Sequence, residues 1–386
     1  MRVAYICADP GLPVFGRKGG SVHVQEVIRG LRRLGHQVEL LATRLGGEPP
    51  ADLAGLAVTA LPAIGRGSPA TREAAGRQAN RGLSAALDAV GPVDLVYERY
   101  SLWSHAGMAW ARRTGTPAVL EVNAPLIDEQ AEHRSLVGRQ EAEACARAAF
   151  EDATAVVAVS EPVADWVRAR TPAPERVHVV GNGVDPERIV ARPRVDHPNH
   201  FTIGFVGTLK PWHGLETLVD AFALLAGADF TYRLLVVGDG PGAGGLADSL
   251  ERRGLTSMIT LAGAVDPAAI PEYLHGMDLA VAPYPDLPHF YFSPLKLYEY
   301  LAAGLPVVAS EVGQVAEVID DGRTGVLCPP GDAAALARAI AGLRYNPAGR
   351  ASMASAGRAE VVAHHSWDEV VGRILRLVRA APAQAA

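Results

Sequence analysis

Lysine is rare in this sequence and occupies only three positions, Lys18, Lys210 and Lys296, although lysine and arginine together number 36. A compact ammonium group meets a phosphate as a point charge, whereas the planar guanidinium of arginine suits paired hydrogen bonds. A chain that uses arginine at every other basic position is expected to keep lysine where a compact cation is needed. We interpret Lys210 and Lys296 as phosphate-binding residues, with Lys18 as the weaker candidate.

A glycine-rich loop at 16–21 lies between an apolar run near the start of the chain and a segment with helical spacing. Gly19 and Gly20 would let backbone amides at the start of that helix approach a phosphate without an intervening Cβ. Taken alone this signal is weak, because many glycine-rich turns only connect a strand to a helix.

A second loop of this kind, at 204–214, contains Gly207, Thr208 and Lys210. Its lysine can point toward a diphosphate, and the alternative is an ordinary surface charge on a solvated loop. The scarcity of lysine favours the phosphate-binding interpretation.

A proline-containing segment later in the chain combines a helix start with two charged residues. Ser293 is expected to cap the helix and Pro294 to occupy its first turn, which leaves free amide donors at the helix start. Lys296 and Glu299 are three residues apart, so they share one face of that helix. The two residues could form only a weak surface ion pair. Alternatively, Lys296 could bind a phosphate while the carboxylate of Glu299 accepts hydrogen bonds from the two hydroxyls of a ribose.

Short runs rich in Val, Ile and Leu alternate with longer segments of helical spacing, as is typical of parallel sheets covered by helices on both faces. Strands are predicted at 2–8, 37–43, 56–62, 94–100, 118–123 and 155–160, and again at 201–207, 232–238, 259–263, 279–283, 306–310 and 325–328. This repetition predicts an α/β protein with two Rossmann-like, doubly wound domains.

A polar, proline-rich stretch at 192–200 has turn chemistry and little to bury, and the domain junction is placed just before it. We assign residues 1–185 to an N-terminal domain and residues 186–365 to a C-terminal domain. An amphipathic helix at 366–380 must pack on another surface. Ligands are expected in a cleft between the two domains, where the carboxyl ends of both sheets would face.

Composition narrows the classes of partner. The 386-residue chain has a formal net charge of -6 and no dense basic run, which argues against nucleic acid. No apolar stretch reaches the roughly 20 residues of a membrane span, and the arginine-rich stretch 66–81 fits a solvated helix face, so membrane contact is at most peripheral.

The sequence has three cysteines, Cys7, Cys145 and Cys328. They are odd in number and lack metal-ligand spacing, which favours buried thiols in a reducing, cytoplasmic compartment.

Five short motifs follow one another in an order that resembles the retaining glycosyltransferases of family four, which have the GT-B fold. The motifs are Gly19 with Gly20, the run 35–38, the run 181–185, the run 238–241, and Glu299 followed by 302–308. Each is modest, but together they span nearly the whole chain. The resemblance implies transfer of a sugar from a nucleotide diphosphate sugar to an acceptor.

The same resemblance implies where the ligands bind. The N-terminal domain would bind the acceptor, the C-terminal domain would bind the donor, and the last helix would pack back on the N-terminal domain. Glu299 would hold the donor ribose and Gly20 would approach the diphosphate. The other residues expected at the donor are Gly19, Gly207, Thr208, Lys210, Gly238, Ala264, Val265, Tyr291, Ser293, Pro294, Leu295 and Lys296, with Ala264 and Val265 along the base.

The sequence departs from the family pattern in three ways. The family commonly has two glutamates separated by seven residues, and Tyr291 stands where the first would be. The usual basic pair in the 204–214 loop reads Thr208 and His213, with Lys210 as a substitute. Asn123 replaces a histidine at the end of the fifth strand and is expected to face the sugar or the acceptor. We interpret the chain as a variant branch of the family that lacks the first glutamate.

The resulting hypothesis is retaining transfer without a metal or an organic cofactor, from a uridine or guanosine diphosphate sugar to a small-molecule, glycan or lipid-linked acceptor. Lys210 and Lys296 would stabilise the departing nucleotide, and Asn123 would lie over the donor. One alternative is a nucleotide-sugar 2-epimerase of the same fold, although no convincing cluster of carboxylates or histidines supports it. The other is a non-catalytic nucleotide-sugar-binding subunit, suggested by Tyr291. The sequence makes no prediction of oligomeric state.

Overall fold

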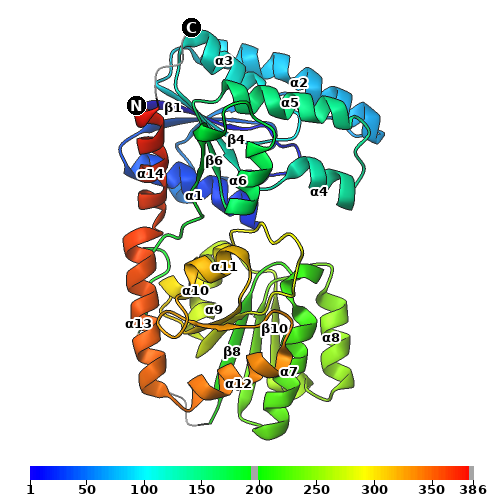
Figure 1. The fold of residues 1–386 in the computed structure, drawn as a ribbon, viewed down its shortest axis with the longest axis vertical. Coiled ribbons are helices and arrows are strands. Elements are labelled where there is room, and N and C mark those ends of the chain that lie inside the picture. Colours follow the sequence, from blue (N-terminus) through cyan, green and yellow to red (C-terminus); the bar gives the residue numbers. More distant parts are fainter. Residues whose placement is uncertain (193–198, 382–386) are drawn as a thin grey trace. The chain divides into compact units, whose positions relative to one another are not determined.

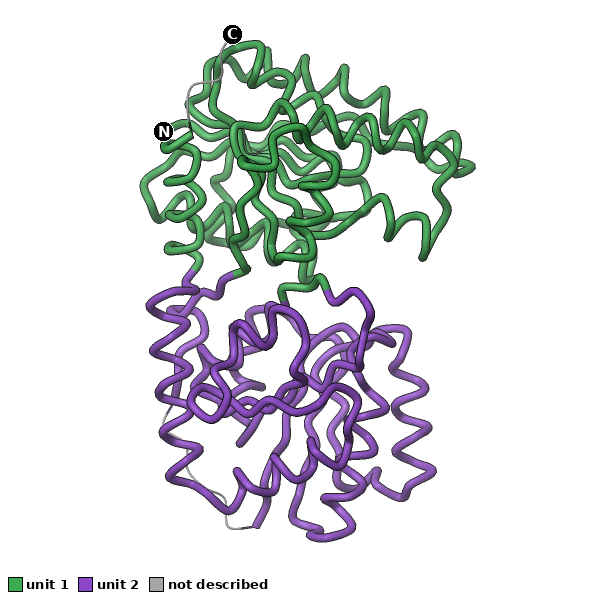
Figure 2. Tube along the Cα trace, viewed as in Figure 1, with its two compact units in different colours: residues 1–182, 291–293, 367–386 green, residues 183–290, 294–366 purple. Residues whose placement is uncertain are grey.

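The computed structural model describes residues 1–192 and 199–381, which form two compact units. Unit 1 contains residues 1–182, 291–293 and the chain from 367 onward, and unit 2 contains 183–290 and 294–366 (Figure 2). The boundary at 182 lies close to the predicted boundary at 185. Most of the predicted linker, 193–198, lies outside the described residues.

Unit 1 is built on a seven-stranded parallel sheet with the order β3-β2-β1-β4-β5-β6-β7. Its strands are β1 (Arg2–Cys7), β2 (Gln37–Ala42), β3 (Ala57–Ala60), β4 (Leu95–Arg99), β5 (Ala118–Val122), β6 (Ala155–Ala158) and β7 (Val177–Val179). The first six agree with the predicted strands. The seventh was missed because it has only three residues and carries a histidine at its centre.

Helices cover both faces of the unit 1 sheet, with α1 and α14 packed together and α3 packed against α2 and α5 (Figure 1). The helices are α1 (Gly19–Arg33), α2 (Pro69–Val90), α3 (Ala106–Thr114), α4 (Leu126–His133), α5 (Arg139–Asp152), α6 (Glu161–Arg168) and α14 (Trp367–Ala380), with short 3-10 turns η1 (Ala51–Leu53) and η2 (Pro174–Arg176). The apolar stripe of α14, which includes Trp367 and Val371, is buried. Gly30 of α1 allows this contact, since a Cβ there would lie 3.0 Å from Val371 Cγ2.

Unit 2 repeats the scheme with a six-stranded parallel sheet in the order β10-β9-β8-β11-β12-β13. Its strands are β8 (Phe201–Val206), β9 (Tyr232–Val237), β10 (Ile259–Gly263), β11 (Leu279–Ala282), β12 (Val307–Ser310) and β13 (Val326–Cys328). Its helices are α7 (Leu215–Ala228), α8 (Ala243–Arg252), α9 (Ile270–His275), α10 (Leu295–Ala302), α11 (Gly313–Val318), α12 (Ala333–Arg344) and α13 (Pro347–His364), with η3 (Pro211–His213), η4 (Thr256–Met258) and η5 (Pro267–Ala269). All six strands were predicted.

The strand order of each sheet reverses once along the chain, between β1 and β4 in unit 1 and between β8 and β11 in unit 2. In doubly wound sheets, ligands bind outside the carboxyl ends of the strands at such a switch point. We therefore expect ligand-binding residues in the loops that follow these four strands.

The structure bears on the predicted state of the cysteines and on the predicted lack of a membrane-spanning segment. Cys7 and Cys328 are buried, Cys145 is half-buried, and all three thiols are free. Within 1–192 and 199–381, no helix is both long enough and apolar enough to cross a bilayer.

Candidate functional site

The ammonium group of Lys296 lies at the switch point of the unit 2 sheet. Its Nζ is 4.2 Å from the ring centroid of Phe205 in β8 and 5.3 Å from that of Tyr284, which follows β11. Lys296 is 8% exposed, and its Nζ has no hydrogen-bond partner among the residues that the structure describes. Burial lowers the pKa of Lys296 to about 7, and the carboxylate of Glu299 opposes this shift. Because a buried cation without an acceptor is costly, the arrangement suits an anionic ligand.

Two glycines at the ends of β8 and β9 let the backbone close around this ammonium group. A Cβ at Gly207 would lie 2.9 Å from Lys296 Nζ, and a Cβ at Gly238 would lie 1.9 Å from the carbonyl oxygen of Gly207. Their φ angles of 148° and 140° are also ones that other residues rarely adopt. The structure thus brings three of the predicted donor residues together.

The loop after β8 places His213 near the ammonium groups of both Lys210 and Lys296. Burial lowers the pKa of His213 to about 3, and Lys296 and, to a smaller extent, Lys210 add to this shift. The neutral ring donates a hydrogen bond from Nδ1 to the carbonyl oxygen of Thr208, and Lys210 Nζ lies 5.4 Å from the ring centroid of Trp212. Both predicted phosphate-binding lysines therefore lower the pKa of one imidazole, and Lys296 Nζ and His213 both lie within 4 Å of a Cβ built at Gly207.

Glu299 lies on α10, near an arginine that sequence reasoning missed. Its carboxylate is 3.9 Å from Arg188 Nη2, and Arg188 also donates to the carbonyl oxygen of Pro267 at 3.3 Å. The predicted base-binding residues Ala264 and Val265 lie between β10 and η5, a few residues before Pro267. An ion pair as long as that of Glu299 is weak. Arg188 was missed because 111 residues separate it from Glu299.

Ser293 does not cap α10, so this prediction is wrong. Its Oγ accepts a hydrogen bond from the backbone N–H of Asn182 at 3.0 Å, and its carbonyl oxygen accepts one from Asn182 Nδ2 at 2.7 Å. The helix begins at Leu295, so Pro294 is its N-cap residue and does not lie in the first turn as predicted, and no side chain caps the helix. The amide donors expected at this helix start are therefore not occupied by a capping side chain.

Tyr291, the residue in place of the first glutamate, makes its side-chain contact within unit 1. Its hydroxyl donates to the carboxylate of Glu129 on α4, and its carbonyl oxygen accepts from Ser160 Oγ at 2.7 Å. Burial and the neighbouring Glu129 carboxylate raise the pKa of Tyr291. The segment 291–293 therefore belongs to unit 1, although its predicted place was the C-terminal domain.

Gly19 and Gly20 form the first residues of α1 in unit 1. The N-cap residue, Lys18, provides no side-chain cap. A Cβ at Gly20 would lie 2.8 Å from Leu12 Cδ1 and 3.7 Å from Arg99 Nη2. The guanidinium of Arg99, the last residue of β4, thus lies beside the amide-rich start of α1 at the unit 1 switch point, where an anion would be favoured.

Asn123 follows β5 and is half-buried, two residues after the buried Glu121 of that strand. Burial raises the pKa of the Glu121 carboxyl group to about 7, against the opposing effect of Arg99. The Nε2 atom of His23 lies 2.9 Å from Glu121 Oε1. Burial lowers the pKa of His23, and Arg99 lowers it further. Sequence reasoning did not single out Glu121, although a glutamate inside an apolar strand was a visible signal.

Binding of a nucleoside diphosphate to unit 2 is expected to take up a proton at about pH 8, because Lys296 is then largely uncharged and a diphosphate favours its ammonium form. Affinity should accordingly fall as pH rises through about 7. Calorimetric titration in two buffers of different ionisation heat measures the uptake, and Lys296→Met should abolish it. Equal binding heats in both buffers for the unaltered protein would contradict the assignment.

Family models match both halves of the chain. The model described as Glycosyltransferase Family 4 matches residues 17–188, and the model described as Glycosyl transferases group 1 matches residues 200–346. The first match lies largely in unit 1 and the second in unit 2.

Curated relatives are similar over different lengths. A glycogen synthase of Mycobacterium tuberculosis (strain CDC 1551 / Oshkosh) is 28% identical over 194 residues, which are 50% of this chain and 46% of that protein. The chain spans about half the length of several such relatives. By contrast, the D-inositol 3-phosphate glycosyltransferase 1 of Catenulispora acidiphila is 29% identical over 97% of this chain and 93% of its own length.

Solved structures share the fold. The sucrose-phosphate synthase of Thermosynechococcus elongatus superposes with a TM-score of 0.73 at 19% identity, covering 98% of both chains. Together with the two parallel sheets, this likeness confirms the predicted GT-B fold. The models described as Glycosyltransferase Family 4 and Glycosyl transferases group 1 together match most of the chain, which places it among these glycosyltransferases.

Proposed function

We propose that the protein transfers a sugar, with retention of anomeric configuration, from a nucleoside diphosphate sugar to an acceptor hydroxyl. The observation that carries this proposal is the buried ammonium of Lys296, which has no hydrogen-bond partner within 1–192 and 199–381 and lies against Gly207 at the switch point. A diphosphate supplies the acceptor oxygens that this group lacks. The near full-length similarity to an inositol phosphate glycosyltransferase supports the same reaction class.

The proposed reaction requires charge stabilisation more than it requires a nucleophilic side chain. As the bond between the anomeric carbon and the phosphate oxygen breaks, its electron pair leaves with the nucleoside diphosphate. Lys296, Lys210 and the uncapped start of α10 stabilise that growing charge. The acceptor oxygen bonds to the anomeric carbon on the same face, and its proton passes to the departing phosphate oxygen. Glu299 accepts the ribose hydroxyls.

A thermal-shift screen against uridine, guanosine and thymidine diphosphate sugars tests the donor class, because a ligand that binds only the folded protein raises its unfolding temperature. A uridine or guanosine diphosphate sugar is the expected donor, and a small molecule, a glycan or a lipid-linked sugar is the expected acceptor. Products should then be analysed with and without an acceptor pool. An epimerised donor formed without acceptor would overturn the proposal in favour of a 2-epimerase, and binding without any turnover would favour a non-catalytic subunit.

Removal of divalent metal is expected to leave transfer essentially unchanged, because Lys296 and Lys210 provide the positive charge that a metal would otherwise supply to the diphosphate. Initial rates should be compared after dialysis against a chelator and after readdition of magnesium or manganese. A loss of activity that only the metal restores would contradict metal-independent transfer.

A further inference from the structure

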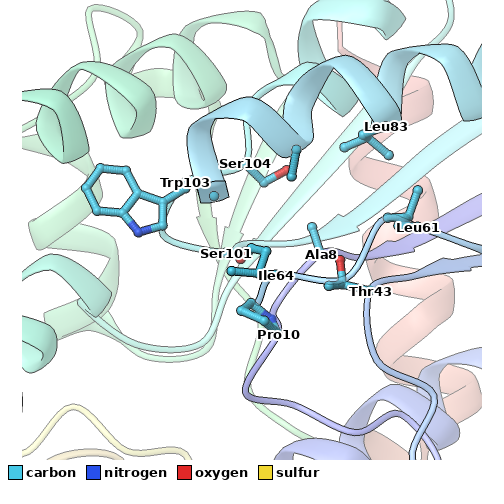
Figure 3. Close-up of a pocket in the computed structure, with 11 residues that line it drawn as sticks. Ala8, Pro10, Thr43, Leu61, Ile64, Leu83, Ser101, Trp103 and Ser104 are labelled. Atoms are coloured by element: carbon cyan, nitrogen blue, oxygen red, sulfur yellow. The ribbon is translucent and has the colours of Figure 1, made fainter. Parts of the chain in front are cut away.

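A small pocket opens at the carboxyl edge of the unit 1 sheet, between the strand ends and the inner face of α2 (Figure 3). Its volume is about 30 Å³, room for on the order of two water-sized groups. The lining carries the hydroxyl groups of Thr43, Ser101 and Ser104 and the indole of Trp103, and its other side chains are aliphatic. None of these lining residues carries a charge.

One hydroxyl of the lining is oriented by a buried carboxyl group. Ser104 Oγ donates a hydrogen bond to Glu98 Oε1 at 2.5 Å, and Glu98 is 1% exposed. Burial raises the pKa of Glu98 to about 7, and the hydrogen bond from Ser104 opposes this shift. When Glu98 is ionised, the only hydrogen of the Ser104 hydroxyl is used in this bond. The Ser104 oxygen can then accept a hydrogen bond from a group in the pocket but cannot donate one.

The geometry points to a subsite for an uncharged hydroxymethyl group of the acceptor, with its O–H donating to Ser104 Oγ and its carbon packed against the apolar lining. This inference rests on the proposed function, in which unit 1 binds the acceptor. The C6 arm of a hexopyranoside has the two heavy atoms that the pocket holds.

The same features discriminate among close analogues. A 6-deoxy sugar would fill the space with a methyl group but leave the oxygen of Ser104 without a donor, an unmade hydrogen bond that weakens binding by about tenfold. A 6-carboxylate would meet no cation in the lining and would approach the carboxylate of Glu98, so it should bind most weakly.

The test measures binding of methyl hexopyranosides by ligand-observed nuclear magnetic resonance at about pH 8, where Glu98 is mostly ionised. The glucoside, mannoside and galactoside should each be compared with the 6-deoxy and 6-carboxylate forms. Ala79→Leu fills the pocket, and Ala85→Leu, at an exposed position of the same helix, is its matched control. Ser104→Ala removes the oriented oxygen.

The inference predicts that at least one hexoside binds, with its 6-deoxy form about tenfold weaker and its 6-carboxylate weaker still. Ala79→Leu should remove binding while Ala85→Leu retains it, and Ser104→Ala should erase the preference for hydroxymethyl over methyl. Equal binding of all three forms, no binding of any, or equal binding by Ala79→Leu and Ala85→Leu would overturn it. Nucleotide-sugar binding, measured separately by thermal shift, tests the proposed function. Failure of the proposed function can therefore be distinguished from failure of the hydroxymethyl subsite.

Discussion

Replacement of Lys296 by alanine is expected to lower the turnover of the donor sugar by about 100-fold or more, the usual loss when one preorganised charge is removed from a developing anion. The Nζ of Lys296 faces Gly207 and lacks a hydrogen-bond partner within the described chain, so its charge is available to a ligand. Stability should not fall in parallel, since the substitution also removes a buried cation whose Nζ has no hydrogen-bond partner among the described residues. Initial rates and unfolding temperatures of the same samples measure both effects.

Lys296→Met is the matched control for this prediction, because it keeps an unbranched side chain between the rings of Phe205 and Tyr284 while removing the charge. A charge effect requires both variants to lose activity to a similar extent. If Lys296→Met retains near-normal turnover, packing and not charge explains the alanine result. If Lys296→Ala itself is near normal, Lys296 has no place in the mechanism.

The sheets and the donor-side loops could be predicted because both leave local signals. Strands buried on both faces read as short apolar runs, and the six predicted in each unit are present. The choice of Lys210 and Lys296 used a compositional bias that needs no structure, and both ammonium groups lower the pKa of His213. Parallel topology explains why such loops can lie close together, because strand ends distant in sequence meet at one edge of the sheet.

The remaining contacts depend on pairs of residues far apart in the chain, which no local pattern specifies. Ser293 has the sequence context of a helix cap, yet its oxygen bonds Asn182, 111 residues away. Tyr291 reads as a lost glutamate, yet its hydroxyl bonds Glu129, 162 residues away. Local capping preference is worth on the order of 1 kcal/mol, so a tertiary hydrogen bond of similar strength can override it. The sequence therefore indicated that the segment 291–293 is important, but it did not indicate Asn182 and Glu129 as its hydrogen-bond partners.

Gly214→Ala is expected to destabilise unit 2 by about 3 kcal/mol or more, through a backbone clash added to backbone strain. Gly214 precedes α7 with a φ of 68°, and a Cβ there would lie 1.6 Å from the carbonyl oxygen of Pro283. This oxygen belongs to the chain just after β11, so the clash cannot be relieved by rotating a side chain. The loop that carries Lys210 and His213 would have to move away from the strand end, and donor binding should weaken with it.

Gly254→Ala separates the two contributions, because Gly254 has the same φ of 68° but no atom within 4 Å of a Cβ built there. Its cost should be the left-handed strain alone, about 1–2 kcal/mol. For a unit of this size each kcal/mol lowers the unfolding temperature by roughly 2–4 °C, so scanning calorimetry should place Gly214→Ala well below Gly254→Ala. Donor affinity should fall only in Gly214→Ala. Equal unfolding temperatures would mean that the loop moves away from Pro283 at no cost in stability. Preorganisation of Lys210 and His213 by this loop would then not explain catalysis.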